Sequence, residues 1–180
     1  MGVLKPALLF FACAVLQSGP ILAAPTTAEV EAVFLFNFSQ FVEWPPQAFA
    51  EPGSPIIICV LGSDPFGTTL DEVVRGETVQ GRALSVRRFQ RVEDLTECQI
   101  LFISRSEQAR LQPILKTLQG RSILTVSDLE EFAGDGGVIC FVLVDNKIRL
   151  RVNLHAAKAA GLTLSSKLLR PAQIVGPGEP

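Results

Sequence analysis

Tyrosine is absent from the sequence and histidine occurs once, as His155, so two side chains that often transfer protons in enzymes are missing or single. His155 falls on a predicted helix beside Ala156 and Ala157, where we expect it to face solvent. No GxSxG nucleophile motif is present, and Gly62 and Gly67 form a GxxxxG spacing without the Lys-Ser/Thr pair of a P-loop. Because spacing nominates no acid–base pair, the sequence predicts a protein that is not an enzyme and has no cofactor.

Long apolar runs are also lacking. After the first 24 residues, no segment approaches the roughly 18 continuous apolar residues that a membrane-spanning helix needs. Residues 1–24 combine one positive charge, Lys5, with a short apolar run over 7–16 and small residues up to Ala24. This pattern is typical of a signal peptide cleaved after Ala24 or Ala23, and an uncleaved anchor is the alternative. We therefore expect an exported protein that is not embedded in the membrane.

Charge of one sign does not dominate the chain. Removal of residues 1–24 leaves 15 basic and 18 acidic side chains, so the net charge of the mature chain is near −3. The basic residues are scattered along the sequence, which together with export argues against a nucleic-acid partner. The remaining 156 residues fit a single domain, which we place at residues 25–175, and residues 176–180 (GPGEP) are typical of a disordered tail.

The mature chain would keep three cysteines, Cys59, Cys98 and Cys140. In an oxidising compartment an odd number predicts one disulfide and one free thiol, and the sequence alone allows three pairings. There is no CxxC motif, and the only histidine is distant from all three cysteines, so we expect no metal site.

The first predicted helix carries an unusual number of aromatic side chains, in the stretch FLFNFSQFVEWPP over residues 34–46. Thr26 and Glu29 have the spacing of a capping box, and Pro45 and Pro46 should stop the helix after Trp44. Apolar residues at helical spacing predict a stripe that packs on the protein core. These residues are Val30, Val33, Phe34, Phe38, Phe41 and Val42.

Phe36 and Trp44 lie off that stripe. On a soluble protein they would form an exposed aromatic patch, which usually marks an interface with a partner. The alternative is that the whole helix is core, enclosed on two sides.

The rest of the chain alternates between apolar runs and helical patterns. Strands without polar alternation are predicted over 56–61, 99–104 and 122–127, with Asp128 beyond the last of them, and a shorter strand is predicted over 84–88. Helices are predicted over 66–74, 92–95, 106–118, 129–132 and 154–160, with a last helical turn over 166–171. A hairpin follows at 138–152, turning at Asp145-Asn146.

Buried strands separated by helices predict an α/β fold with a mostly parallel sheet of Rossmann-like or flavodoxin-like type, flanked by helices. The hairpin is expected to add an antiparallel edge at the C-terminal side.

Ligands of such sheets bind outside the carboxyl ends of the strands. The polar residues predicted there are Ser63, Asp64, Ser104, Ser127 and Asp128. They lie next to helix N-termini, where free backbone N–H groups can hold an anion. The alternative is that they only cap those helices.

Six blocks of sequence occur in an order and at spacings that resemble the YfiR family of exported bacterial proteins. The blocks are EAVFLFNFSQFVEWPPQAF, IIICVLGSDPFG, QGRALSVRRF, CQILFIS, SILTVSDLEEFAGDGGVICFVL and IRLRVNLHAAKAAGLTLSSKLLRPAQIV. No single block is diagnostic, and together they cover about residues 28–175.

The resemblance implies a periplasmic α/β protein, often a homodimer, that binds the periplasmic sensor domain of an inner-membrane diguanylate cyclase, a GGDEF protein. By holding this enzyme off, such a regulator controls cyclic di-GMP signalling and biofilm formation. The alternative function is a periplasmic sensor that binds a small molecule in the strand-end cleft.

The resemblance also implies a disulfide between Cys59 and Cys98, since the family pairs the cysteines of these two blocks. The family's second disulfide is not reproduced. Cys140 matches one half of it, while the region of the expected partner, near Ala133, has no cysteine. We therefore expect Cys140 to remain a thiol.

Overall fold

The computed structural model describes residues 24–176 and residue 178. The predicted signal peptide therefore lies outside the described residues, apart from Ala24, and so do residues 177, 179 and 180 of the predicted tail. Within the described part of the chain, no helix is long and apolar enough to cross a membrane.

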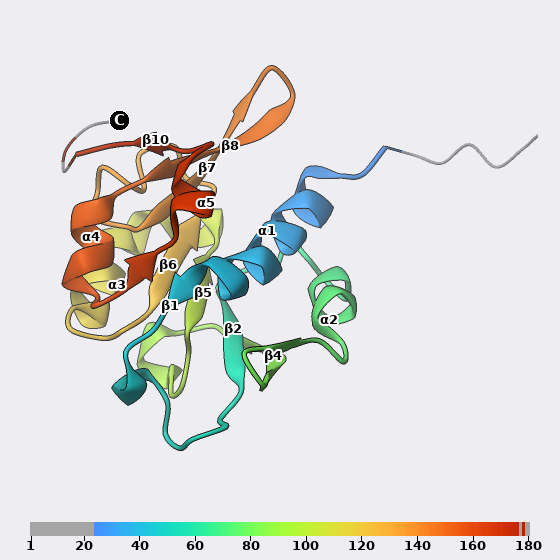
Figure 1. The fold of residues 1–180 in the computed structure, drawn as a ribbon. Coiled ribbons are helices and arrows are strands. Elements are labelled where there is room, and N and C mark those ends of the chain that lie inside the picture. Colours follow the sequence, from blue (N-terminus) through green and yellow to red (C-terminus); the bar gives the residue numbers. More distant parts are fainter. Residues whose placement is uncertain (1–23, 177, 179–180) are drawn as a thin grey trace, which may run out of the picture.

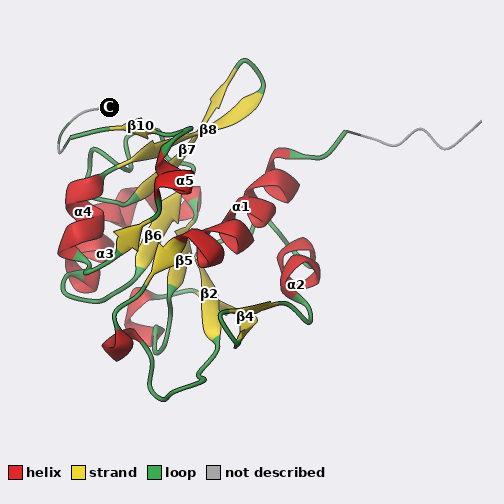
Figure 2. Cartoon of the chain, in the orientation of Figure 1, coloured by secondary structure: helices red, strands yellow, loops and turns green. Residues whose placement is uncertain are grey.

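An eight-stranded sheet forms the centre of the molecule, in the order β10-β8-β7-β6-β5-β2-β4-β3 (Figure 2). Its strands are β2 (Ile56–Leu61), β3 (Thr78–Val79), β4 (Arg82–Phe89), β5 (Ile100–Ile103), β6 (Leu124–Ser127), β7 (Ile139–Val144), β8 (Lys147–Val152) and β10 (Gln173–Ile174). Five neighbouring strands of the sheet, β4, β2, β5, β6 and β7, are parallel to one another. The strand β8 returns antiparallel to β7. A separate antiparallel pair joins β1 (Val42–Glu43) to β9 (Thr163–Leu164).

This arrangement confirms the predicted fold class. The five parallel strands, numbered along the chain, lie in the order 2-1-3-4-5 of the flavodoxin-like sheets. The strands β2, β5 and β6 are buried throughout because both faces of the sheet are covered there, so that alternate side chains of one strand enter two different cores. The strand β4 is only partly buried. In β2, Ile58 and Val60 face one core, whereas Ile57, Cys59 and Leu61 face the other.

Helices divide between the two faces of the sheet (Figure 1). The first core contains side chains of α1 (Thr27–Phe41), α2 (Thr69–Val74), α4 (Leu154–Ala159) and α5 (Ser166–Leu169). The second contains α3 (Leu111–Leu118) and the single turn η2 (Val92–Asp94). Two further 3₁₀ segments are η1 (Pro46–Ala48) and η3 (Arg105–Arg110).

The start of α1 follows the predicted capping box, whereas its end does not. The Thr26 backbone N–H donates to Glu29 Oε2 at 2.6 Å, and the Glu29 N–H donates to Thr26 Oγ1 at 3.2 Å. The helix ends at Phe41 rather than after Trp44, because Val42 and Glu43 are drawn into the pairing of β1 with β9.

Three other helices differ from the prediction. The helix predicted from residue 66 begins at Thr69, since Asp64 Oδ1 accepts from the Phe66 N–H at 2.8 Å and holds a turn there. The helix predicted over 106–118 is tight 3₁₀ structure as far as Arg110. Residues 129–132 form turns only, because the Gly137 N–H donates back to the Phe132 carbonyl and closes the chain on itself.

The β7–β8 hairpin projects from the body of the sheet (Figure 1). It turns at Asp145 and Asn146, with φ values of 49° and 57°, as predicted for this pair. The hairpin is not the outermost element, since β10 pairs in parallel with Arg151 and Val152 at the far end of β8.

Candidate functional site

The loop after β2 is closed by the chain's own side chains. The Ser63 N–H donates to Ser106 Oγ at 2.9 Å. Ser106 and the buried Glu107 lie so close to Gly62 that a Cβ there would collide with both, and Gly62 has a φ of 87°. At the point where a flavodoxin-like sheet binds its ligand, this chain therefore carries a packed serine and glutamate.

Four of the predicted strand-end residues have hydrogen-bond partners within the chain. Asp64 Oδ2 accepts from Arg88 Nε at 2.6 Å, and Ser104 Oγ accepts from the Ser106 N–H at 3.3 Å. Ser127 Oγ donates to the Ile103 carbonyl at 2.7 Å, and Asp128 Oδ2 pairs with Arg105 Nε at 2.6 Å. The capping and pairing roles are thus visible, and a ligand cleft at these residues stays a prediction.

Asp128 belongs to a charged cluster with Arg105 and Glu31. Asp128 Oδ1 is buried without a hydrogen-bond partner, and the side chain of Glu31 on α1 is 5% exposed. Burial, with the negative charge of Asp128 as the second cause, raises the pKa of Glu31 to about 7. The hydrogen bond to Asp128 raises the pKa of Arg105.

Sequence reasoning missed Glu31, although a signal was present. Glu31 has helical spacing to the buried Leu35, Phe38 and Val42, so it lies on the buried side of the helix.

The aromatic helix packs differently from the prediction. The side chains of Leu35 and Phe38 are fully buried, whereas Val33 is 45% exposed. Phe38 stacks on Phe141 of β7 with ring centroids 5.9 Å apart. The buried stripe is therefore rotated from the predicted one.

Phe36 and Trp44, predicted to form an exposed patch, are each half-buried against the first core. Trp44 Nε1 donates to the Gln99 carbonyl at 3.1 Å, which ties the indole to the start of β5. The patch is smaller than predicted because each ring uses part of its surface in packing. Whether the remaining surface contacts a partner stays a prediction.

Cys59 and Cys98 form a disulfide, as the family resemblance implied, with Cα atoms 6.1 Å apart. Cys140 is free and buried, and its thiol lies 2.8 Å from the Leu129 carbonyl oxygen. Burial raises the pKa of Cys140 to about 11. Within the described residues, no three His, Cys, Asp or Glu side chains gather closely enough to hold a metal ion.

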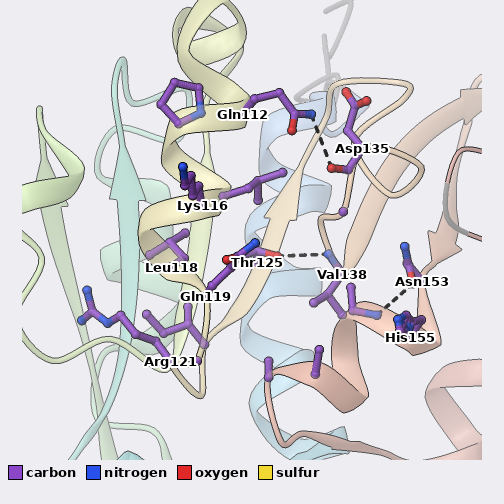
Figure 3. Close-up of a pocket in the computed structure, with 18 residues that line it drawn as sticks. Gln112, Lys116, Leu118, Gln119, Arg121, Thr125, Asp135, Val138, Asn153 and His155 are labelled. Carbon is purple, nitrogen blue, oxygen red and sulfur yellow. Dashed lines mark hydrogen bonds between the residues drawn. The ribbon is translucent and has the colours of Figure 1, made fainter.

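A groove that was not predicted lies between α3 and α4 (Figure 3). Its volume is about 940 Å³, and its lining includes Lys116, Arg121 and His155, which is exposed as expected. The polar groups deepest in it are already paired, since Thr125 Oγ1 accepts from the Val138 N–H and Asn153 Nδ2 donates to the Ala133 carbonyl. No motif signalled this groove because its walls come from elements far apart in the sequence.

Comparison with known proteins places the chain in a family. The model of the YfiR/HmsC-like family matches residues 28–173, which is most of the chain, and the chain therefore belongs to this family. The family is regulatory, non-catalytic and periplasmic. No curated protein matches the chain.

Proposed function

We propose that this member of the YfiR/HmsC-like family is a non-catalytic periplasmic regulator that binds the sensor domain of an inner-membrane diguanylate cyclase and represses it. Family membership over residues 28–173 carries the proposal, since it links the whole fold to regulation of diguanylate cyclases. In keeping with a protein that works by contact, the strand-end serines and aspartates serve as caps and ion pairs.

Deletion and binding measurements test this function. Loss of the gene should raise cyclic di-GMP and biofilm formation, and the purified mature chain should bind the periplasmic domain of a diguanylate cyclase from the same organism. In the deletion strain, expression of the chain without residues 1–24 should leave cyclic di-GMP high, because we propose that these residues direct export of the protein. Unchanged cyclic di-GMP on deletion, together with no binding to the sensor domain, would contradict the proposal.

Phe36 and Trp44 are our candidates for aromatic contacts with the sensor domain. Each ring keeps part of its surface accessible while the rest packs on the core. Rigid, well-supported aromatic side chains are the usual centres of binding energy in an interface. We also propose a homodimer, which sedimentation of the mature chain would detect.

A second candidate function is the binding of a small molecule. The α3–α4 groove of about 940 Å³ favours it, because ligand sites have volumes of roughly 300–1,000 Å³. One cation of its lining, Lys116, would suit an acidic compound. Thermal shift of the mature chain with a panel of metabolites tests this role, and a Lys116→Ala variant should lose any shift that arises in the groove.

A further inference from the structure

The outer side of the β7–β8 hairpin is an unpaired strand edge. Within the described residues, β8 pairs on this side with β10 alone, and only at Arg151 and Val152. No strand covers β8 from Lys147 to Leu150, and the hairpin tip stands away from the body of the protein (Figure 1). Exposed strand edges readily accept a further strand, and proteins usually block them.

Backbone geometry identifies the residue whose polar groups point outward. Across the two-residue turn, Val144 pairs with Lys147, which makes Lys147 and Arg149 the residues that bond to β7. The Val152 carbonyl accepts from the Val175 N–H on the opposite side, in agreement with this alternation. The N–H and C=O of Ile148 therefore face away from β7.

The two faces of this edge have different chemistry. Lys147, Arg149 and Arg151 alternate along β8 and share one face, and no ion pair involves them within the described part of the chain. The other face carries Ile148 beside Leu143, which is 60% exposed.

A groove of about 510 Å³ runs along this apolar face, between the hairpin and the start of α1. Its lining includes Val30, Phe34, Leu143 and Ile148. A strand added to the edge of β8 would place every second one of its own side chains next to this groove.

From these observations we infer that the β8 edge, Lys147–Leu150, binds an extended acidic segment of a partner protein by strand addition. Main-chain hydrogen bonds at Ile148 would supply affinity. Acidic side chains of the added strand would face Lys147 and Arg149, and its alternate apolar side chains would face the groove. The inference deepens the proposed function. It rests on that function for one point, the identification of the partner as the sensor domain.

Charge selects this occupant over a second copy of the chain. Antiparallel pairing of two β8 edges would set Lys147 and Arg149 of one copy opposite those of the other on the same face. Like charges directly opposite each other across a strand pair are destabilising. An acidic strand turns the same row into attraction.

Peptide binding to the mature chain tests the edge without the cyclase. The probe is an eight-residue peptide that alternates glutamate and valine, with a lysine–valine peptide and a backbone N-methylated glutamate peptide as controls. We expect the glutamate peptide to bind at least tenfold more tightly than either control, measured by fluorescence anisotropy at low salt. Equal binding of all three peptides would overturn the inference.

Variants then separate charge from backbone pairing. Lys147→Glu/Arg149→Glu should weaken glutamate-peptide binding at least tenfold, while the matched reversal Lys158→Glu/Arg170→Glu, at exposed sites elsewhere, should not. Ile148→Pro removes an outward N–H that makes no bond to β7, and it should also weaken binding at least tenfold relative to Ile148→Ala. Circular dichroism confirms that each variant is folded.

The remaining outcomes are distinguishable. Peptide binding that survives both β8 variants would overturn the inference, as would a dimer in sedimentation that Ile148→Pro dissociates, since that result assigns the edge to a second copy. If the peptide binds as expected but the sensor domain does not bind, the edge stands and the proposed function fails. If the sensor domain binds equally to wild type and to Lys147→Glu/Arg149→Glu, the proposed function stands and the edge is not its docking site.

Discussion

Single buried polar groups determine how this protein responds to pH and to oxidation. Glu31 is enclosed between the first helix and the sheet, where it meets the charges of Arg105 and Asp128. Cys140 is enclosed on the other face of the sheet and contacts the Leu129 carbonyl. In both cases burial disfavours the charged form, so each group holds its proton to a higher pH than in an unfolded chain.

We expect Glu31 to make the protein less stable as the pH rises. Its pKa in the folded chain is about 7, against an ordinary value of 4.5. The folded state therefore binds more protons between these values, and the contribution of Glu31 is fully present below pH 4.5 and lost above pH 7. A difference of this size corresponds to about 3 kcal/mol in the free energy of unfolding.

The substitution Glu31→Gln should therefore stabilise the chain at pH 8 and change little at pH 4.5. Urea unfolding at both pH values measures the difference, with the exposed Glu51→Gln as the matched control. If Glu31→Gln shifts the unfolding midpoint equally at the two pH values, the carboxyl group does not titrate in this range.

For Cys140 we expect protection from thiol reagents in the native state. The side chain is fully buried, and a pKa of about 11 leaves almost no thiolate at neutral pH. Labelling with a maleimide should follow the unfolding of the protein and become rapid only in urea. Labelling within seconds in buffer would show that the β7 strand opens at this position.

At the scale of elements, sequence patterns predicted the long strands of the sheet more reliably than helix ends, whereas the two-residue strands β1, β3, β9 and β10 were not predicted. The run Ile56–Leu61 matches β2 without error, since six consecutive buried apolar residues fit a covered parallel strand. The end of α1 was misplaced by three residues because β9, its distant partner in the chain, recruits Val42 and Glu43. Local periodicity contains no information about such pairing.

The candidate sites show the same limit. The serines and aspartates at strand ends were found from their positions after apolar runs, because topology brings the ends of parallel strands together. The α3–α4 groove and the basic row of β8 were missed. The groove depends on how two helices sit on opposite faces, and the row depends on which side of β8 remains unpaired.

Substitutions in α1 should separate core from candidate interface. Phe38→Ala should lower the free energy of unfolding by about 3–5 kcal/mol, because Phe38 is fully buried and stacks on Phe141. Phe36→Ser and Trp44→Ser remove half-buried rings and should cost less stability, while each weakens sensor-domain binding by more than about 2 kcal/mol. Thermal melting and titration with the purified domain provide the two measurements.

The difference between these variants decides whether the aromatic stretch is core or partner surface. If Phe36→Ser or Trp44→Ser melts the protein as severely as Phe38→Ala, the ring acts as core. If both variants fold and bind normally, the partner surface lies elsewhere, and the β8 edge becomes the first place to look.

On the scale of the whole molecule, two cores share one sheet, and the disulfide belongs to only one of them. Cys59 and Cys98 lie in the second core, with α3, whereas α1 and the buried apolar side chains of β8 belong to the first. The bridge links the central strand β2 to the segment that enters β5, on the side away from α1. Stability and partner contact should therefore respond differently to its loss.

Removal of the bridge should destabilise the fold while leaving the binding surface intact in the folded fraction. The two cysteines are separated by 39 residues in the sequence. Opening a loop of roughly this length costs about 4 kcal/mol by the loop-entropy estimate, which is a large part of the stability of a small domain. Cys59→Ala/Cys98→Ala should therefore unfold at a much lower urea concentration, and wild type treated with a reductant should behave in the same way, since Cys140 contributes no bridge.

At low temperature, where the variant is still folded, the glutamate–valine peptide and the sensor domain should bind with wild-type affinity, because β8 and α1 lie in the first core. A wild type that melts identically before and after reduction would contradict the stabilising role, and a folded variant that no longer binds would show that the two cores are coupled.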